Sequence, residues 1–254
     1  MVSMLATLIT KVVIAAIVLI ILLALLGRRI LHSGMFLLVF FFVYFADNFL
    51  MVVTIQYPSL QLIPARTWEG YLVSNWSGKL FSILFTLVLL YFSRRILSRD
   101  EIGLTLRQKE GSLLACGLVI LVLVGWSTIV GISSPKGKFD ILTLGYLAFM
   151  PSLNEELVYR GCLLGILNKL LPKKINFLGA WMGWGAVITS LLFSLLHGFG
   201  FNNDLSIHID AIALRNSFIS GFIFAWLRER SGSLLMPVIA HGIEDFFFFL
   251  PRML

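Results

Sequence analysis

The sequence predicts an all-α, polytopic integral membrane protein with about eight transmembrane helices. Of its 254 residues, 59% are hydrophobic and only 13% are charged, and the mean hydropathy is +0.94. Long apolar runs recur along the whole chain, and most are near the roughly 20 residues that an α-helix needs to cross a bilayer. A soluble protein of this length would instead fold as one or two domains with polar surfaces.

The apolar runs are separated by short polar segments. They cover residues 4–26, 34–54, 72–92, 113–132, 141–171, 177–197, 209–227 and 234–250. The fourth run, Leu113 to Ile132, has no charged residue and is the clearest span. The first run is followed by the basic pair Arg28-Arg29 and shows no small-residue cleavage site, so we expect a retained span rather than a signal peptide.

The basic residues that give the net charge of +7 are unevenly distributed along the chain. Most basic residues fall in alternate segments between the runs, namely Arg28, Arg29, Arg94, Arg95, Arg99, Arg107, Lys109, Lys169, Lys173, Lys174, Arg228 and Arg230. Since basic loops stay in the cytoplasm, this distribution predicts a multi-pass plasma-membrane protein with both termini outside. The short loops and strong asymmetry are typical of prokaryotes. The charge thus serves orientation in the lipid bilayer, and we expect no binding of nucleic acid.

The charged segment 93–112 divides the chain into two predicted parts. Residues 1–110 form accessory N-terminal transmembrane helices with the charged linker, and residues 111–254 form the functional core. In the accessory part, Asp47 and Asn48 interrupt the second run, and we expect an interhelical hydrogen bond there. Cys116 and Cys162 lie in apolar sequence and are predicted to be small buried side chains rather than a disulfide.

Three short polar patterns interrupt the apolar runs of the core. They are Glu155-Glu156 with Arg160, Phe193 with His197, and His241 with Asp245. In each pattern the last residue lies four positions after an earlier one, Glu156 in the first pattern, which places the two on one face of a helix. Each charge near the bilayer centre costs roughly 2.5–3.5 kcal/mol, so such residues are paired or functional. We expect Glu156 to pair with Arg160 one turn later, whereas Glu155 has no basic residue at either helical spacing.

Carboxylates and imidazoles together suit the activation of water and the stabilisation of an oxyanion. This chemistry hydrolyses peptide bonds without a nucleophilic side chain. A zinc site built from Glu155, His197, His241 and Asp245 is an alternative with the same residues. Two non-enzymatic alternatives also remain open. The cluster could hold helices together in a membrane scaffold or immunity protein, or its glutamates could relay protons in a small transporter.

The glutamates follow Pro151, which ends or kinks a helix. Ser152 and Glu155 have the spacing of a capping box, so a helix could restart near Ser152 within the membrane. A continuous, kinked helix is the alternative.

The three patterns resemble the intramembrane endopeptidases related to the type II CAAX prenyl endopeptidase and to bacteriocin-processing and immunity proteins, the CPBP or Abi family. The matching stretches are Glu155-Glu156-Leu157-Val158-Tyr159-Arg160-Gly161, Phe193-Ser194-Leu195-Leu196-His197 and His241-Gly242-Ile243-Glu244-Asp245. The resemblance covers about residues 140–250. It implies an eight-span helical membrane protease with a glutamate mechanism and no metal or other cofactor.

The resemblance also implies a role for each residue. Glu155 would be the general base that activates water, and His197 would help to hold that water. Glu156 and Arg160 would fix the helix and tune the base. His241 would form the oxyanion hole together with residue 245.

At position 245 the prenyl endopeptidase branch typically has asparagine, whereas this chain has Asp245. An ionised aspartate cannot donate a hydrogen bond, so Asp245 is either protonated or orients His241. With the termini outside, the site is expected in the outer half of the bilayer. The expected substrate is a membrane-associated or exported protein or peptide.

Overall fold

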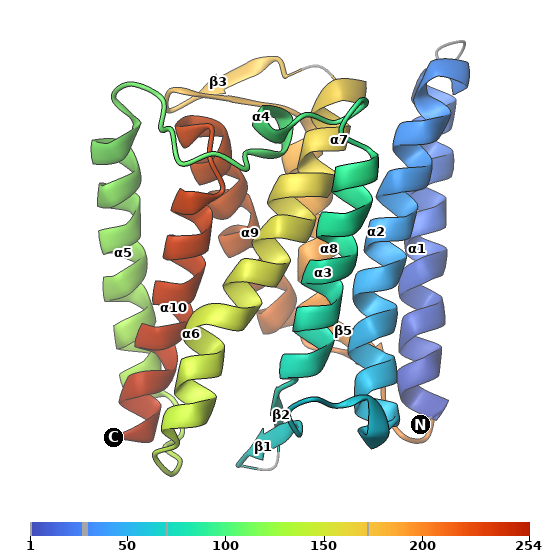
Figure 1. Cartoon of the computed structure of the whole chain (residues 1–254). Helices are drawn as coiled ribbons and strands as arrows, with labels where there is room; N and C mark the ends of the chain where they lie inside the picture. Colours follow the sequence, from blue (N-terminus) through green and yellow to red (C-terminus); the bar gives the residue numbers. More distant parts are fainter. Residues whose placement is uncertain (1, 27–29, 70, 172) are drawn as a thin grey trace.

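The computed structural model describes residues 2–26, 30–69, 71–171 and 173–254. Within these ranges most residues are helical, and the long helices lie side by side in one bundle (Figure 1). Both ends of the chain lie at the same end of the bundle. The all-α class predicted from the sequence is confirmed, and the strands in the described ranges are short hairpins at the bundle ends.

The first part of the chain contributes three long helices. Its elements are α1 (Val2–Leu26), α2 (Ile30–Gln56), η2 (Pro58–Leu60), β1 (Arg66–Trp68), β2 (Tyr71–Ser74), α3 (Trp76–Phe92) and α4 (Arg99–Ile102). The rest contains α5 (Ser112–Ser133), α6 (Ile141–Glu155), η3 (Glu156–Leu163), α7 (Leu164–Leu170), β3 (Ile175–Phe177), β4 (Ala180–Met182), α8 (Trp184–Gly198), β5 (Phe199–Phe201), β6 (Ile207–Ile209), α9 (Ala211–Ser231) and α10 (Leu235–Met253).

Each predicted apolar run coincides with a long helix, but two helices begin four or more residues after the start of their runs. The run from 72 opens with strand β2, and α3 begins only at Trp76, where the Asn75 side chain accepts a hydrogen bond from Gly78 N and caps the helix. The run from 177 opens with the β3–β4 hairpin, whose turn places Gly179 at φ +80°. Apolar composition alone does not separate these short hairpins from the helices that follow.

The surface of α5 is strongly apolar. Leu114 and Val122 are 76% and 71% exposed, and Leu121 and Trp126 also face outward. A continuous apolar face of this kind marks contact with lipid or with another protein. Among the described residues, α2 from Gly34 to Gln56 and α5 are long and apolar enough to cross a membrane. The full count of eight crossings stays a prediction.

The two ends of the bundle differ in charge. The linker helix α4 and the β3–β4 hairpin lie opposite the termini, whereas β1, β2 and β5 lie at the end with the termini (Figure 1). The predicted basic segments around α4, α7 and the end of α9 therefore share one end, although Arg28 and Arg29 lie outside the described residues. Helix α4 carries its own capping box, because Ser98 and Glu101 satisfy each other's backbone N–H groups.

The helix that carries the glutamates is continuous. Helix α6 passes through Pro151 to Glu155 and runs on as the π-helix η3 and then α7. Ser152 Oγ donates to Phe149 O at 3.0 Å within the helix. The predicted restart at Ser152 is therefore wrong, and the alternative of one continuous helix holds. π-Helical turns often lie at functional sites, and this one begins at the second glutamate.

Candidate active site

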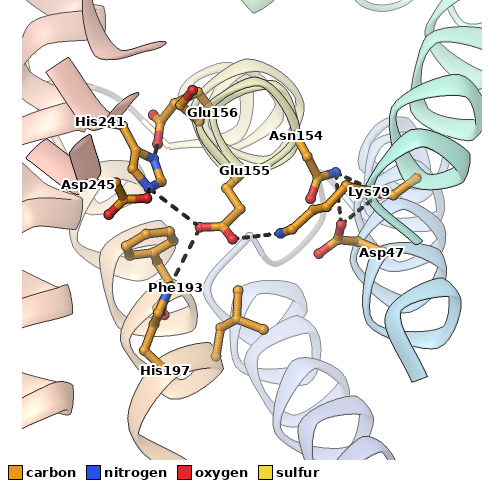
Figure 2. A network of polar contacts seen from close by, with 12 residues as sticks. Asp47, Lys79, Asn154, Glu155, Glu156, Phe193, His197, His241 and Asp245 are labelled. Carbon is orange, nitrogen blue, oxygen red and sulfur yellow. Dashed lines mark hydrogen bonds and ion pairs between the residues drawn. The ribbon is translucent and has the colours of Figure 1, made fainter. Parts of the chain in front are cut away.

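Polar side chains from α2, α3, α6, η3, α8 and α10 meet inside the bundle (Figure 2). The structure brings together all of the residues predicted for the site, namely Glu155, Glu156, Arg160, His197, His241 and Asp245. It adds Lys79 and Asp47 from the first part of the chain.

Glu155 is the last residue of α6, and its side chain is buried. Its Oε1 accepts a hydrogen bond from Lys79 Nζ at 2.6 Å. Its Oε2 lies 3.8 Å from His197 Nε2 and 4.0 Å from His241 Nε2, and no hydrogen bond among the described residues reaches it. One carboxylate oxygen is thus held by an ammonium group, while the other faces two imidazoles.

Glu156 connects two other elements of the site. Its Oε1 accepts from Arg160 Nη1 at 3.2 Å and lies 2.9 Å from His241 Nδ1. The predicted ion pair with Arg160 is confirmed, and the contact with His241 is additional. Because an ionised carboxylate can only accept, Nδ1 of His241 carries a proton and Nε2 is the nitrogen that faces Glu155. The Arg160 guanidinium also lies 4.2 Å from the ring centre of Phe193.

The site becomes more exposed toward His197 and Asp245. The side chains of Glu156 and Arg160 are 0% exposed, whereas that of His197 is 37% exposed and that of Asp245 is 26% exposed. His197 Nδ1 lies 2.9 Å from the carbonyl oxygen of Phe193, which can only accept a hydrogen bond. The other ring nitrogen of His197, Nε2, therefore faces Glu155. Asp245 Oδ2 lies 3.6 Å from His241 Nε2. A substrate would therefore approach from the side of His197 and Asp245.

Two glycines allow helices to approach closely beside the site. A Cβ at Gly242 would lie 2.3 Å from Ala148 O of α6, so only glycine lets α10 bring His241 against Glu156. A Cβ at Gly78 would lie 2.5 Å from the Asn75 side chain and 2.7 Å from that of Thr54 in α2. Small residues at such contacts are typical of membrane helix packing.

Sequence reasoning did not assign Lys79 to the site. The signal was present, because a lysine within the run 72–92 requires a partner and Glu155 lacked one in its own helix. The interhelical hydrogen bond predicted for Asp47 is confirmed, since its Oδ1 accepts from Ser82 Oγ at 2.7 Å and from Asn154 Nδ2 at 3.1 Å. Asn48 instead donates to Tyr44 O within its own helix. The first part of the chain thus contributes to the site, while the division at residue 110 stays a prediction.

The alternative zinc site stays a prediction. In the described part of the chain, no group of three or more His, Cys, Asp or Glu side chains is placed to hold one metal ion. Glu155 Oε2 lies 3.8 Å from His197 Nε2 and 4.0 Å from His241 Nε2, and Oε1 accepts a hydrogen bond from Lys79 Nζ. Cys116 and Cys162 are both free and buried, as the sequence predicts for small apolar side chains.

The fold and the site define a mostly helical protein with a buried carboxylate between two imidazoles. The family model of the type II CAAX prenyl endopeptidase Rce1-like proteins matches residues 137–247, which confirms the predicted family resemblance over this segment. The segment runs from just before α6 into α10 and holds every residue of the predicted site. Lys79 and Asp47 lie outside it.

An uncharacterised 24.3 kDa protein of Escherichia coli is 35% identical to this chain over 102 residues. That match covers 40% of this chain and 40% of the relative, so the two are similar over less than half of their lengths. No solved structure matches the chain.

Proposed function

We propose that this protein is an intramembrane endopeptidase that hydrolyses a peptide bond of a membrane-associated or exported protein through a metal-free glutamate mechanism. One observation carries the proposal. The buried carboxylate of Glu155 is anchored through Oε1 and presents Oε2 to the imidazoles of His197 and His241. The family of the matched segment, whose name denotes an endopeptidase, supports the same reaction class.

The distances suit a water molecule as the nucleophile. Separations of 3.8 and 4.0 Å are too long for direct hydrogen bonds, and one water can bridge polar atoms at this spacing. Glu155 takes a proton from that water while the water oxygen forms a bond to the scissile carbonyl carbon. Glu155 then gives the proton to the amide nitrogen, the C–N bond breaks, and a carboxylic acid and an amine leave.

The negative charge on the carbonyl oxygen needs donors during this step. His241 Nε2 can donate when the ring is an imidazolium, a state that the Glu156 carboxylate against Nδ1 favours. Asp245 lies beside the same nitrogen and either donates as a neutral acid or orients the ring. Glu156 and Arg160, both fully buried, hold the His241 side of the site in place.

Asp245→Asn separates the two roles of Asp245. Asparagine keeps the size of the side chain and always has an N–H group to donate, so we expect activity within about tenfold of wild type if residue 245 acts as a donor. Asp245→Leu removes every polar atom and should lower kcat by about 10²-fold or more, as for an oxyanion donor. Peptide cleavage by the purified variants provides the measurement. An asparagine variant as inactive as the leucine variant would show that the carboxylate orients His241.

We further propose eight crossings of a prokaryotic plasma membrane, with both termini outside and the site in the outer half of the bilayer. His197 lies at the end of α8 that leads to β5, near the termini, whereas the basic segments lie at the opposite end. A membrane-impermeant thiol reagent added to intact cells should label Asn203→Cys but not Lys174→Cys. The parent chain, whose two cysteines are buried, gives the background. The reverse labelling pattern would show that the chain has the opposite orientation in the membrane.

The activity itself is tested by comparing peptide termini in membrane and secreted fractions, by mass spectrometry, between cells carrying wild type and cells carrying Glu155→Ala at equal expression. Termini that vanish with the variant would establish proteolysis and identify the substrate. Unchanged termini, with any growth or protection phenotype intact, would favour the scaffold role instead.

A further inference from the structure

Lys79 and Glu155 form a buried ion pair that crosses from the first part of the chain to the core. Their side chains point toward each other, with 2.6 Å between Nζ and Oε1 (Figure 2). The exposed fractions of the two side chains are 8% and 6%. From this geometry we infer that Lys79 is a positioning residue for the reaction: it holds the glutamate base in its ionised form and aims the free oxygen at the histidines. The inference rests on the proposed function.

The first step of the argument is the choice of oxygen. A short, charge-assisted hydrogen bond fixes Oε1 and with it the plane of the carboxylate. Only Oε2 then remains to accept the proton of a water held near His197 and His241. Without Lys79 the carboxylate could rotate, and either oxygen could turn away from the histidines.

The second step is the rigidity of the contact. Ser82, one turn after Lys79 on α3, donates to Asp47, and Asn154, the neighbour of Glu155 on α6, donates to both Ser82 and Asp47. Helices α2, α3 and α6 are thus joined by hydrogen bonds beside the ion pair. The tight approach at Gly78 holds α3 against α2 at the same level. These contacts hold the Lys79 backbone in one place, so the ammonium position is determined by the fold.

The third step concerns the proton. A buried carboxylate favours its neutral form unless a positive charge compensates, and a neutral acid cannot accept a proton from water. The Lys79 ammonium keeps the carboxylate charged before the attack. After Glu155 has taken the proton, the same ammonium favours its release to the leaving nitrogen. One fixed charge therefore keeps Glu155 ionised before the attack and favours its return to that form when the peptide bond breaks.

The test uses the full chain in liposomes with a cleavable peptide and three variants. Lys79→Met removes the charge at similar length, Lys79→Arg restores a charge, and Thr86→Val is a packing control at a buried position two turns further along α3. We expect Lys79→Met to lower kcat at least tenfold with little change in KM, because the substrate still binds. The acidic limb of its pH–rate profile should move up by about one to three pH units.

Lys79→Arg should recover part of kcat and return the acidic limb of the pH–rate profile toward its wild-type position. Thr86→Val should match wild type in both kcat and the position of this limb. The other charged or titratable groups around Glu155 are unchanged in every variant; they are Lys11, Asp47, Tyr146, Glu156, Tyr159, Arg160, His197, His241 and Asp245. A Lys79→Met protein with wild-type kcat and an unmoved acidic limb would overturn the inference.

A second measurement separates this inference from the proposed function. If wild type cleaves nothing, the proposed function fails, and the ion pair is then tested by unfolding. In a double-mutant cycle of Lys79→Met and Glu155→Gln, the combined loss of stability should be clearly smaller than the sum of the two single losses. Additive losses would show that the two side chains do not interact.

Discussion

Glu155→Gln is expected to lower kcat/KM for peptide cleavage by about 10²- to 10⁴-fold. Glutamine has the size of glutamate, and its carbonyl oxygen can still accept the hydrogen bond from Lys79. An amide nevertheless cannot take a proton from water at neutral pH. The loss therefore reports on the base itself and should fall on kcat, since packing and substrate binding are preserved. The measurement is cleavage, by the purified protein in liposomes, of a peptide spanning the cleavage site found from the peptide termini.

A matched control exists at the opposite end of the bundle. Glu229 is also buried and also pairs with a lysine, Lys173, but it lies among the basic connections far from His197. Glu229→Gln makes the same chemical change to a buried glutamate in an ion pair and should leave kcat/KM within a few-fold of wild type. If Glu155→Gln kept more than a tenth of the wild-type rate, the general-base role would be wrong.

Arg160→Met is expected to have the largest effect on stability, a loss of about 3–5 kcal/mol in the free energy of unfolding. Glu156 and Arg160 are both 0% exposed, and removing the guanidinium leaves a buried carboxylate whose one ion-pair partner among the described residues is His241. The guanidinium also packs over the Phe193 ring, so contact area is lost with the charge. Reversible unfolding in mixed micelles measures the change.

Two further variants identify the cause of that loss. Combining Arg160→Met with Glu156→Gln removes both charges and should regain part of the stability, because the carboxylate that lost its guanidinium is removed as well. Lys169→Met breaks the pair of Lys169 with Glu101, whose side chains are 30% and 38% exposed, and should cost at most about 1 kcal/mol. Equal losses from Arg160→Met and Lys169→Met would contradict a buried pair.

The sequence predicts the helices and most of the site because both depend on local spacing. The apolar runs locate each long helix, and residues four apart place Glu156 beside Arg160 and His241 beside Asp245. The three polar patterns also contain the six residues that the structure brings together around Glu155. No long-range information is needed for these predictions.

Four features could not be predicted in this way. The contact of Lys79 with Glu155 joins residues 76 positions apart, and that of His241 with Glu156 joins residues 85 apart, so each depends on how helices pack. The π-helix η3 changes only the hydrogen-bond spacing of the backbone, and the amino-acid composition of the segment does not reveal it. Ser152 has the spacing of a helix cap, but its hydroxyl bonds within α6 because the chain there is already helical.

The position of Lys79 outside residues 137–247 has a consequence for comparing proteins of this kind. Two proteins could share that whole segment and still place different charges against the same glutamate, since the charge comes from a separate helix. The reactivity of the shared segment could then be adjusted by changes in α3 alone, without any change among the residues by which the family is recognised. Annotation transferred through the matched segment would describe the reaction class of such proteins but not their working pH.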